Sequence, residues 1–478
     1  MASIGSEHAP LSRRRLSARR LEGASTAARF DLGGALARVR ALYSDGSESS
    51  LARRLAGTAF LIRVVAAVVA FVSQILLARW MGGFQFGIYI YAWTWVLLIG
   101  GMVDLGLGSA SQRLIPEYTE RKEPALLRGY LRGSRWLALA IGVAVAAVGA
   151  GIVTIAAPHL DAETIIPLYL SCAGLPAFGL GQVLSGIARS YSWVNLGLMP
   201  TYVMRQLLLL VLMGAAYTLG LPTDAATATF IGIAALWGIT LGQWLVLYRR
   251  LKARAVSAGP RDYAVPTWLA TAAPIFVVEA FYLLLSYSDV IVVKQFRPPD
   301  EVAIYYAAAK TLSLVAFIYF SVAQTIAHKF AEYYVVGDRQ RLADFLKLSI
   351  RLTFWPSLAM ILVLLAFGRP LLQLFGSGFV SGYYLMFIIA VGLLARASVG
   401  PAERLLNMLG ERRSCALVYA GSFAIDLILC VALLPSMGIA GAAIASSVAL
   451  VCESASLFFI AKYRLGLHCF IFGRGGER

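Results

Sequence analysis

The stretch that decides the fold is QILLARWMGGFQFGIYIYA, residues 74–92. In it, an apolar run ends at Arg79, crosses a short turn and resumes at Gly87. A second stretch of the same design, DVIVVKQFRPPDEVAIYYAA, occupies residues 289–308, where the first run ends at Lys294. The two copies are 215 residues apart before the turn and 216 after it, so one inserted residue reconciles them.

A membrane chain built as two similar halves is typical of transporters, because two lobes can rock around a site between them. Chance similarity between two apolar hairpins is the alternative. Against it, Arg113 has a basic counterpart 216 residues later, Lys329. Tyr118 has Tyr334 at the same offset.

The composition requires lipid as the main solvent. Hydrophobic residues make up 59% of the 478 and charged residues only 14%, with a mean hydropathy of +0.74. Segments of about 20 apolar residues can each cross about 30 Å of hydrocarbon as a helix. The segments do not alternate as barrel strands do. We therefore expect an all-α polytopic membrane protein with about twelve transmembrane helices, near residues 57–79, 87–109, 136–157, 164–187, 198–219, 227–248, 267–292, 304–327, 349–367, 383–402, 415–434 and 438–461.

The chain is predicted to form two six-helix lobes. We expect a basic, disordered cytoplasmic tail over residues 1–56, an N-terminal lobe over 57–250, a cytoplasmic linker over 251–266, a C-terminal lobe over 267–461 and a tail over 462–478. Because six is an even number, both lobes begin on the same side of the membrane. They should then be related by an axis along the membrane normal.

The basic residues predict the orientation. With the N-terminus inside, 34 of the 42 Lys and Arg residues fall in cytoplasmic segments and four on the opposite side. Both termini are then cytoplasmic, and no cleavable signal peptide is visible. The spread of basic residues over many short loops argues against nucleic-acid binding, despite the net charge of +17. We expect a multi-pass protein of the bacterial cytoplasmic (inner) membrane.

The sequence contains no motif for catalysis, metal binding or a cofactor. There is no phosphate-binding loop, no HExxH and no GxSxG on a strand–helix turn. The five cysteines lack CxxC spacing and the four histidines are scattered. We expect neither an enzyme nor a metal site, and no cofactor. An integral membrane enzyme such as a glycan polymerase or ligase would need a larger extracytoplasmic loop.

Cations inside the predicted spans mark a candidate substrate site. A charge at the bilayer centre costs at least about 2.5–3.5 kcal/mol and therefore faces a cavity or a partner. Arg63 is followed on one helix face by Ala67, Ala70 and Gln74, a small and polar stripe suited to lining a lumen.

Lys310 shares a helix face with Phe317, Ser321 and Gln324. Guanidinium and ammonium groups suit phosphate oxygens, so the candidate substrate-binding residues are Arg63, Gln74, Lys310 and Gln324. The alternative is that Arg63 and Lys310 pair with acids on neighbouring helices to fix packing.

Three carboxylates are candidates for ion coupling. Glu279 follows Arg63 by 216 residues, so the repeat places the two at similar depths, and it shares a face with Tyr282, Ser286 and Asp289. Asp426 and Glu453 lie mid-span, where a carboxylate is either paired or protonated and can carry H⁺ or Na⁺.

Other charges near span ends have simpler expected roles. Asp104 is expected to cap a helix or reach water. Arg205 and Arg396 are expected to extend toward the membrane surface.

The run ARWMGGFQFGIY (78–89), with DLGLG (104–108) and RLIPEY (113–118), resembles the polysaccharide-type flippases. These belong to the multidrug/oligosaccharidyl-lipid/polysaccharide (MOP) exporter superfamily. LFG at 374–376 and NMLGER at 407–412 agree, and the resemblance covers about residues 55–465.

The resemblance implies a MATE/MOP-like fold of two lobes, alternating access and a cationic cavity. It implies transport of a polyprenyl-pyrophosphate-linked oligosaccharide to the outer leaflet, for O-antigen, capsule or exopolysaccharide synthesis. Partners would be this lipid-linked oligosaccharide, membrane lipids, H⁺ or Na⁺, and the glycan assembly machinery. A cation-coupled multidrug exporter of the MATE type is the alternative. The coupling Asp that such exporters carry in their first helix has no counterpart here, where Arg63 is the only charge.

Overall fold

The computed structural model describes residues 48–253, 259–319, 321–323, 330, 332–333 and 338–472. The chain divides into two compact units, Met1–Arg54 and Leu55–Arg478. Of the first unit, only the opening turns of one helix are described. The following account therefore concerns the second unit.

The described part of this unit is helical throughout. Its longer helices are α2 (Glu48–Val103), α3 (Leu107–Glu120), α4 (Pro124–Ala156), α5 (Ala162–Ser190), α7 (Arg205–Thr218), α8 (Ala225–Ala253), α9 (Val265–Phe296), α10 (Pro299–Leu312), α12 (Arg339–Ala366), α14 (Tyr383–Val399), α16 (Arg412–Met437) and α17 (Ile439–Leu465). Shorter turns connect them: η1 (Ala157–His159), α6 (Val194–Met199), η2 (Pro200–Met204), η3 (Ser313–Val315), α13 (Gly368–Phe375), η4 (Ser377–Gly382) and α15 (Ala402–Met408).

Eleven helices among the described residues are long and apolar enough to cross a membrane. The first of them, Gly57–Glu120, has 64 residues, about twice what one crossing needs. It is broken at Gly82, whose φ of 75° and ψ of 167° are not helical and suit a residue without a side chain. The kink separates the predicted spans 57–79 and 87–109, so the described residues of each of the twelve predicted spans fall on a membrane-length helix. The all-helical, polytopic fold is confirmed.

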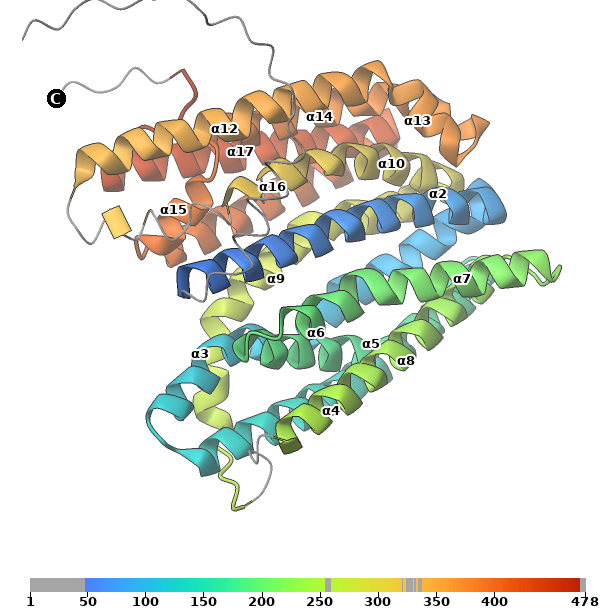
Figure 1. Ribbon diagram of the computed structural model, residues 1–478. Coiled ribbons are helices and arrows are strands. Elements are labelled where there is room, and N and C mark those ends of the chain that lie inside the picture. The colour runs from blue at the N-terminus through green and yellow to red at the C-terminus, as the bar shows by residue number, and fades with distance from the viewer. Residues whose placement is uncertain are drawn as a thin grey trace, which may run out of the picture. The chain divides into compact units, whose positions relative to one another are not determined.

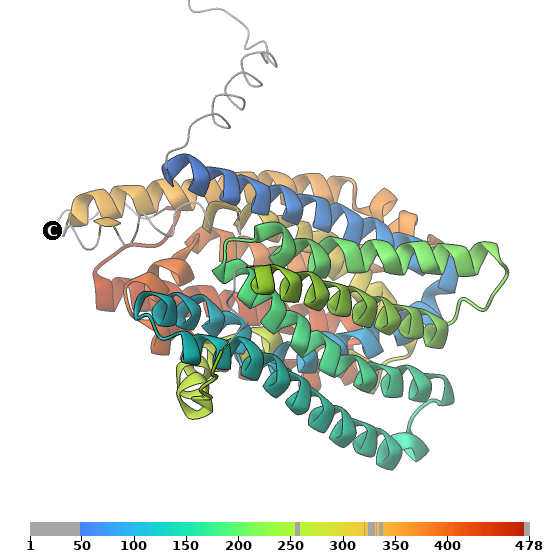
Figure 2. The same cartoon turned by 60° about the horizontal axis from the view of Figure 1, so that its bottom comes forward.

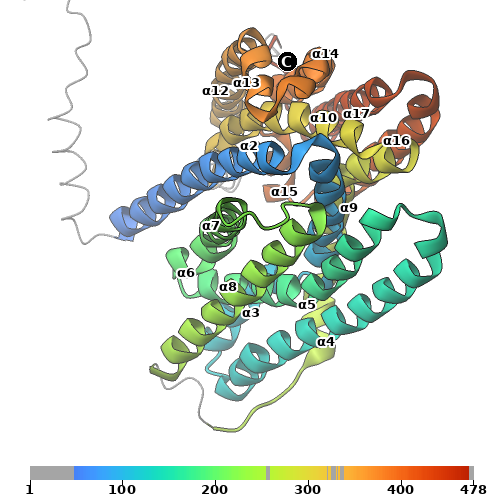
Figure 3. The ribbon, with the colours of Figure 1, turned by 90° about the vertical axis from the view of Figure 1, so that its right-hand side faces the viewer.

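The helices form two sets. Among the N-terminal helices, α5 packs against α3, α4 and α8, and α7 packs against α8. Among the C-terminal helices, α17 packs against α14 and α16, and α14 packs against α10 and α12. Figures 1 and 3 show α12–α17 on one side and α3–α8 on the other, with α2 and α9 running between them. Figure 2 shows α4, α5 and α8 side by side in the N-terminal set.

Small residues allow this close packing where lipid provides no hydrophobic drive between helices. In α17, Ala442, Ala443, Ala445 and Ala449 are fully buried. They lie in or just after the small-residue run that begins the last predicted span. The result is the close contact of α17 with both α14 and α16.

The two repeated hairpins meet at one end of the molecule. A Cβ added to Gly87 would overlap the carbonyl group of Pro299, so only glycine allows the two backbones to approach this closely. The rings of Phe86 and Tyr306 pack edge to face with centroids 6.2 Å apart. The copies recognised in the sequence thus form one shared junction, which we call the hairpin end.

Asp104 caps a helix, as expected. Its buried carboxylate accepts hydrogen bonds from the backbone N–H groups of Gly106 (3.2 Å) and Gly108 (2.9 Å). These donors lie at the start of α3 and have no helical partner of their own. The cap fixes the short turn between α2 and α3.

Candidate substrate cavity

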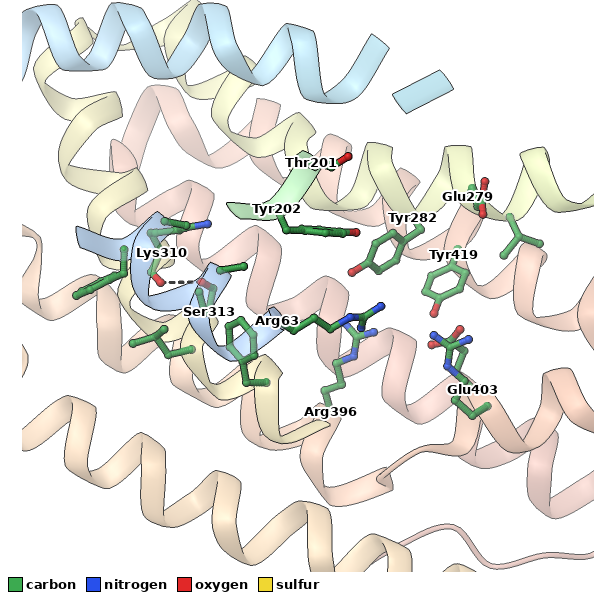
Figure 4. A pocket seen from close by; sticks show the side chains of 18 of the residues that line it. Arg63, Thr201, Tyr202, Glu279, Tyr282, Lys310, Ser313, Arg396, Glu403 and Tyr419 are labelled. Carbon is green, nitrogen blue, oxygen red and sulfur yellow. Dashed lines mark hydrogen bonds between the residues drawn. The ribbon is translucent and has the colours of Figure 1, made fainter. Parts of the chain in front are cut away.

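A cavity of about 800 Å³ lies between the two sets of helices. It is lined by the first half of α2, by η2 and the start of α7, by α9, by α10 and η3, and by α14, α15 and α16. Figure 4 shows Arg63, Lys310 and Arg396 among the side chains around it. It lies away from the hairpin end, toward the end at which α2 begins and α15 lies.

The α2 stripe predicted from the sequence lines this cavity only in part. Arg63, Ala67 and Ala70 all line it, as their helical spacing requires. Gln74, one turn further, is buried outside the cavity, and its Oε1 has no hydrogen-bond partner among the described residues. The reason is Phe71, which lines the cavity and closes it at that depth.

Phe71 begins an aromatic plug between the cavity and the hairpin end. Its ring packs edge to face against Phe375, with centroids 5.8 Å apart. Phe375 contacts Phe379 at 5.8 Å, and Phe379 contacts Phe86 at 6.2 Å. Together with Tyr306 these rings form a continuous apolar barrier.

The predicted faces on α9 and α10 also reach the cavity only with their nearer residues. Glu279 and Tyr282 line it, and Ser109 of α3 donates a hydrogen bond to the Glu279 carboxylate (2.6 Å). Lys310 and Phe317 line it as well. Gln324 lies outside the described residues.

Arg205 is a cavity residue that the sequence did not reveal, because it was expected to extend to the membrane surface. Its guanidinium instead lies over the rings of Trp93 (5.1 Å) and Phe178 (6.0 Å) beside the cavity. Its Nε and one Nη are buried and lack a hydrogen-bond partner in the described chain. A signal that could have indicated it is Pro200, which lies within the same predicted span.

Pro200 begins η2, a π-helical turn, and Thr201 and Tyr202 of this turn line the cavity. A π turn inserts an extra residue into the helix and is frequent at functional sites. Arg205 follows the turn directly.

Arg396 also lines the cavity instead of reaching the membrane surface. Its guanidinium lies 3.6 Å from the carboxylate of Glu453 and over the ring of Tyr319 (5.0 Å). Glu453 is fully buried and does not line the cavity. The predicted coupling residue is therefore held behind the cavity wall by a cavity arginine.

Asp426 lies apart from the cavity, inside the C-terminal helices. Ser288 donates a hydrogen bond of 3.4 Å to its Oδ2, whereas its buried Oδ1 has no partner among the described residues. Nearby, Tyr305 donates to Asp289 (2.7 Å) and contacts Ser446 (3.2 Å). These residues form a buried polar cluster between α9, α10, α16 and α17.

The charge of the cavity lining is predominantly positive. Basic side chains outnumber acidic ones, with Arg63, Arg205, Lys310, Arg396 and Arg404 against Glu279 and Glu403. Of the basic residues, only Arg396 forms a salt bridge within the described part of the chain. No cluster of His, Cys, Asp or Glu suited to a metal ion occurs among the described residues. The lining can therefore hold an anion without first breaking internal ion pairs.

Two latches join the two sets of helices at the hairpin end. Arg79 donates to the carbonyl oxygens of Leu374 (2.6 Å) and Gln373 (3.0 Å) of α13. Lys294 pairs with Asp161, which precedes α5, at 2.8 Å. Arg79 and Lys294 are counterparts in the repeat, so each copy reaches across to the opposite set.

Comparisons with known proteins agree with this architecture. The polysaccharide biosynthesis protein family matches residues 55–327, more than half of the chain, and the MatE family matches residues 274–410. No curated protein sequence matches the chain.

Solved structures show the fold. The chain is similar to an inward-facing multidrug resistance MATE family transporter of the MOP superfamily, with TM-score 0.66, 16% identity and coverage of 85% of this chain and 94% of the other. It is similar to the lipid II flippase MurJ in an inward closed conformation, with TM-score 0.68, 14% identity and coverage of 84% and 87%. A MOP superfamily transporter from Pyrococcus furiosus matches with TM-score 0.63, 14% identity and coverage of 86% and 95%.

The family match confirms the resemblance seen in the hairpin motifs, and the structural matches confirm the MATE/MOP-like fold. The chain belongs to the polysaccharide biosynthesis protein family and is a multi-pass membrane protein with the fold of the MOP superfamily transporters.

Proposed function

We propose that this protein is a flippase that moves a polyprenyl-pyrophosphate-linked oligosaccharide from the cytoplasmic to the outer leaflet by alternating access. The observation that carries the proposal is the cavity of about 800 Å³, whose lining has more basic than acidic side chains; among the described residues only one of these basic side chains, Arg396, forms a salt bridge. The family places the protein in polysaccharide biosynthesis, and O-antigen, capsule and exopolysaccharide are the pathways it would serve.

The chemistry of the cavity suits a lipid headgroup that combines an acidic pyrophosphate with neutral, polar sugars. Arginine presents a planar fork to phosphate oxygens and lysine a compact charge, so Arg63, Arg205 and Lys310 would bind the pyrophosphate. Tyr282 and Tyr419 pack edge to face at 6.0 Å and provide hydroxyl groups and apolar ring faces for sugars.

The proposed cycle uses the two predicted lobes, residues 57–250 and 267–461, joined by the linker 251–266. In the described state, the aromatic plug and the two latches close the hairpin end. With the orientation expected from the basic residues, the termini are cytoplasmic and the cavity faces the cytoplasm of a bacterial inner membrane. Loading would then occur from the leaflet where lipid-linked glycans are assembled, beside the assembly machinery.

For the driving force we propose H⁺ or Na⁺ binding at the buried carboxylates. Glu453 holds Arg396 at the cavity wall, so its protonation would release that cation toward the substrate. Asp426 has one carboxylate oxygen, Oδ1, with no hydrogen-bond partner among the described residues, and Glu279 faces the cavity itself. A carboxylate in such a setting can exchange a partner for a proton or a metal ion.

The match of residues 274–410 to the MatE family supports the second candidate, a cation-coupled multidrug exporter. The excess of basic side chains argues against it, because a cationic drug would be repelled. Purified protein in liposomes separates the two functions. Transport of cationic dyes without transport of a lipid-linked sugar would favour the exporter.

The decisive experiment is performed in cells that lack the gene, in which lipid-linked glycan should accumulate on the cytoplasmic leaflet. The natural protein should relieve the accumulation, whereas Arg63→Ala, and more completely Arg63→Ala with Lys310→Ala, should not. Arg351→Ala is the matched control, because Arg351 is an exposed basic residue of α12 that does not line the cavity. Normal glycan export by the double variant at normal expression would refute the proposed site.

A further inference from the structure

A second hollow, of about 230 Å³, lies between the start of α4 and the end of α8. It shares no lining residue with the substrate cavity. Its wall consists of two stripes at helical spacing and one linker residue: Arg128, Leu131, Arg132, Arg135 and Trp136 of α4, Trp244, Tyr248 and Leu251 of α8, and Arg261. We call this hollow the arginine pocket.

The linker is fastened against α4 and forms one wall of the pocket. The backbone N–H of Asp262 donates to the carbonyl oxygen of Ala125 (3.0 Å), and Arg128 Nε donates to that of Pro260 (2.8 Å). Gly259, with φ of 112°, lies directly against the Arg128 guanidinium, whose carbon would be 3.0 Å from an added Cβ. Arg261 is thereby held beside the arginines of α4, and the pocket exists before any ligand binds.

The pocket gathers positive charge without compensation. Four arginines line it and no carboxylate does. Within the described part of the chain, none of the four forms a salt bridge. Arg135 is half-buried, and its guanidinium lies 6.0 Å from the centre of the Trp244 ring. Withdrawing a guanidinium from water without a counter-ion is costly, so this arrangement favours an anion as the missing partner.

The bias of basic residues toward the cytoplasmic side does not explain this pocket. That bias requires only that lysines and arginines lie in short loops near span ends, where water can surround each of them. Arg249 and Arg250 at the end of α8 are both exposed, and Arg250 lies over the ring of Trp193 (5.3 Å) outside the pocket. The arginines of the pocket instead converge from two segments on one hollow.

The rim of the pocket identifies the kind of anion. Trp136 is 51% and Tyr248 48% exposed, and the rings of Trp136 and Trp244 pack edge to face at 5.9 Å. Exposed Trp and Tyr at the ends of membrane helices occupy the level of the lipid headgroups, with the apolar ring in the acyl region. Basic pockets between such helices on the cytoplasmic side suit acidic headgroups.

We propose that the arginine pocket binds the phosphodiester headgroup of an anionic phospholipid. The headgroup phosphate would lie among Arg132, Arg135 and Arg261, and its acyl chains would pass beside Trp136 and Tyr248 into the bilayer. This site is separate from that of the transported substrate. A lipid held there would bridge α4, α8 and the linker.

The proposal is tested with delipidated, purified full-length protein titrated with phosphatidylglycerol and followed by native mass spectrometry. Each arginine near a membrane surface contributes about fivefold to anionic lipid affinity, so Arg132→Gln with Arg135→Gln should weaken the tightest-bound lipid by about 30-fold. Arg249→Gln with Arg250→Gln removes the same charge from the adjacent helix end, outside the pocket, and should leave that lipid in place. Arg132 is exposed, so Arg132→Gln alone folds normally and should weaken binding by about fivefold.

Two further ligands distinguish the sources of the anion. Phosphatidylethanolamine, which has no net charge, should not compete, and inorganic phosphate should compete only at far higher concentration than the lipid. Equal weakening in the pocket and control variants would overturn the proposal, because it would show only general attraction to charge. Displacement of phosphatidylglycerol by an equal concentration of inorganic phosphate would overturn the assignment to a lipid.

Discussion

Breaking both latches at the hairpin end should open that end of the molecule. Arg79 donates two hydrogen bonds to α13, and Lys294 forms one ion pair with Asp161. Both latches join one set of helices to the other, and they occupy equivalent positions in the repeat. The double variant Arg79→Ala with Lys294→Ala therefore removes both latches and leaves the aromatic plug intact.

The expected size of the effect follows from the exposure of the two latches. Arg79 is exposed and water can replace its partners, so its two hydrogen bonds together contribute about 1 kcal/mol, the lower end of the range for ordinary hydrogen bonds. The side chain of Asp161 is 58% exposed, and such surface pairs contribute about 0.2–1 kcal/mol. Their loss should raise the ratio of open to closed molecules about tenfold, and each single variant should raise it by about threefold to fivefold.

Ala303→Cys can report this opening. Ala303 is fully buried, lies one turn after Pro299 and is the repeat counterpart of Gly87. The introduced cysteine is reacted with a maleimide in purified protein. The reaction of the native cysteines, measured in the chain without Ala303→Cys, is subtracted. The remaining reaction rate should rise about tenfold in the double latch variant. Arg369→Ala is the control, since that arginine lies over Tyr383 within the C-terminal set. An unchanged reaction rate in the double variant would show that the latches do not hold the closed state.

Three further outcomes are expected. Arg205→Gln should weaken binding of a pyrophosphate-linked sugar lipid by about tenfold to 100-fold in an equilibrium binding assay. The reason is that the lost guanidinium has donors at the cavity without a partner among the described residues. Unchanged affinity would exclude Arg205 from the site. Gly87→Ala should raise the reaction rate of the same buried cysteine, because the added Cβ collides with the backbone of the opposite hairpin at a cost of about 1–3 kcal/mol; a rate equal to that of the parent would contradict this close approach. Glu411→Gln should lower the melting temperature at pH 7 but not near pH 3. The hydrogen bond from Ser414, with help from Arg464, lowers the pKa of Glu411 in the folded protein. The charged carboxylate therefore stabilises the fold above the pKa of the unfolded chain, and this stabilisation is lost as the pH falls through the pKa of the folded protein. A pH-independent difference would assign the effect to packing.

The membrane helices and the repeat of the two hairpins were predictable from the sequence, whereas the contact between the hairpins is seen only in the structure. Hydropathy reports the burial of a span in lipid directly, so the described residues of all twelve predicted spans fall on helices of membrane length. Gly82 marks the kink within α2, with helix directly before and directly after it. Helical spacing also identified Arg63, Ala67 and Ala70 as one cavity-lining face.

The rest of the cavity depends on breaks in helical regularity that spacing does not predict. After the π turn at Pro200, a count of 3.6 residues per turn no longer gives the face of Arg205. At the junction of α14 and α15, Gly400 has φ of 60°, and the chain turns so that Glu403 and Arg404 face the cavity. Phe71 ends the lining before Gln74, because a bulky ring and not the polarity of the stripe sets the depth.

The repeat also explains why the two latches resemble each other, whereas the two sides of the binding site do not. At the hairpin end, equivalent positions carry like charges, Arg79 and Lys294, because each must reach across to the opposite set of helices. In the cavity, Arg63 and its counterpart Glu279 carry opposite charges. A junction between two similar halves can keep their symmetry. The proposed substrate, with an acidic part and a neutral part, has no such symmetry. The binding site must therefore depart from the repeat, and a comparison of the two halves predicts where the molecule closes better than what it holds.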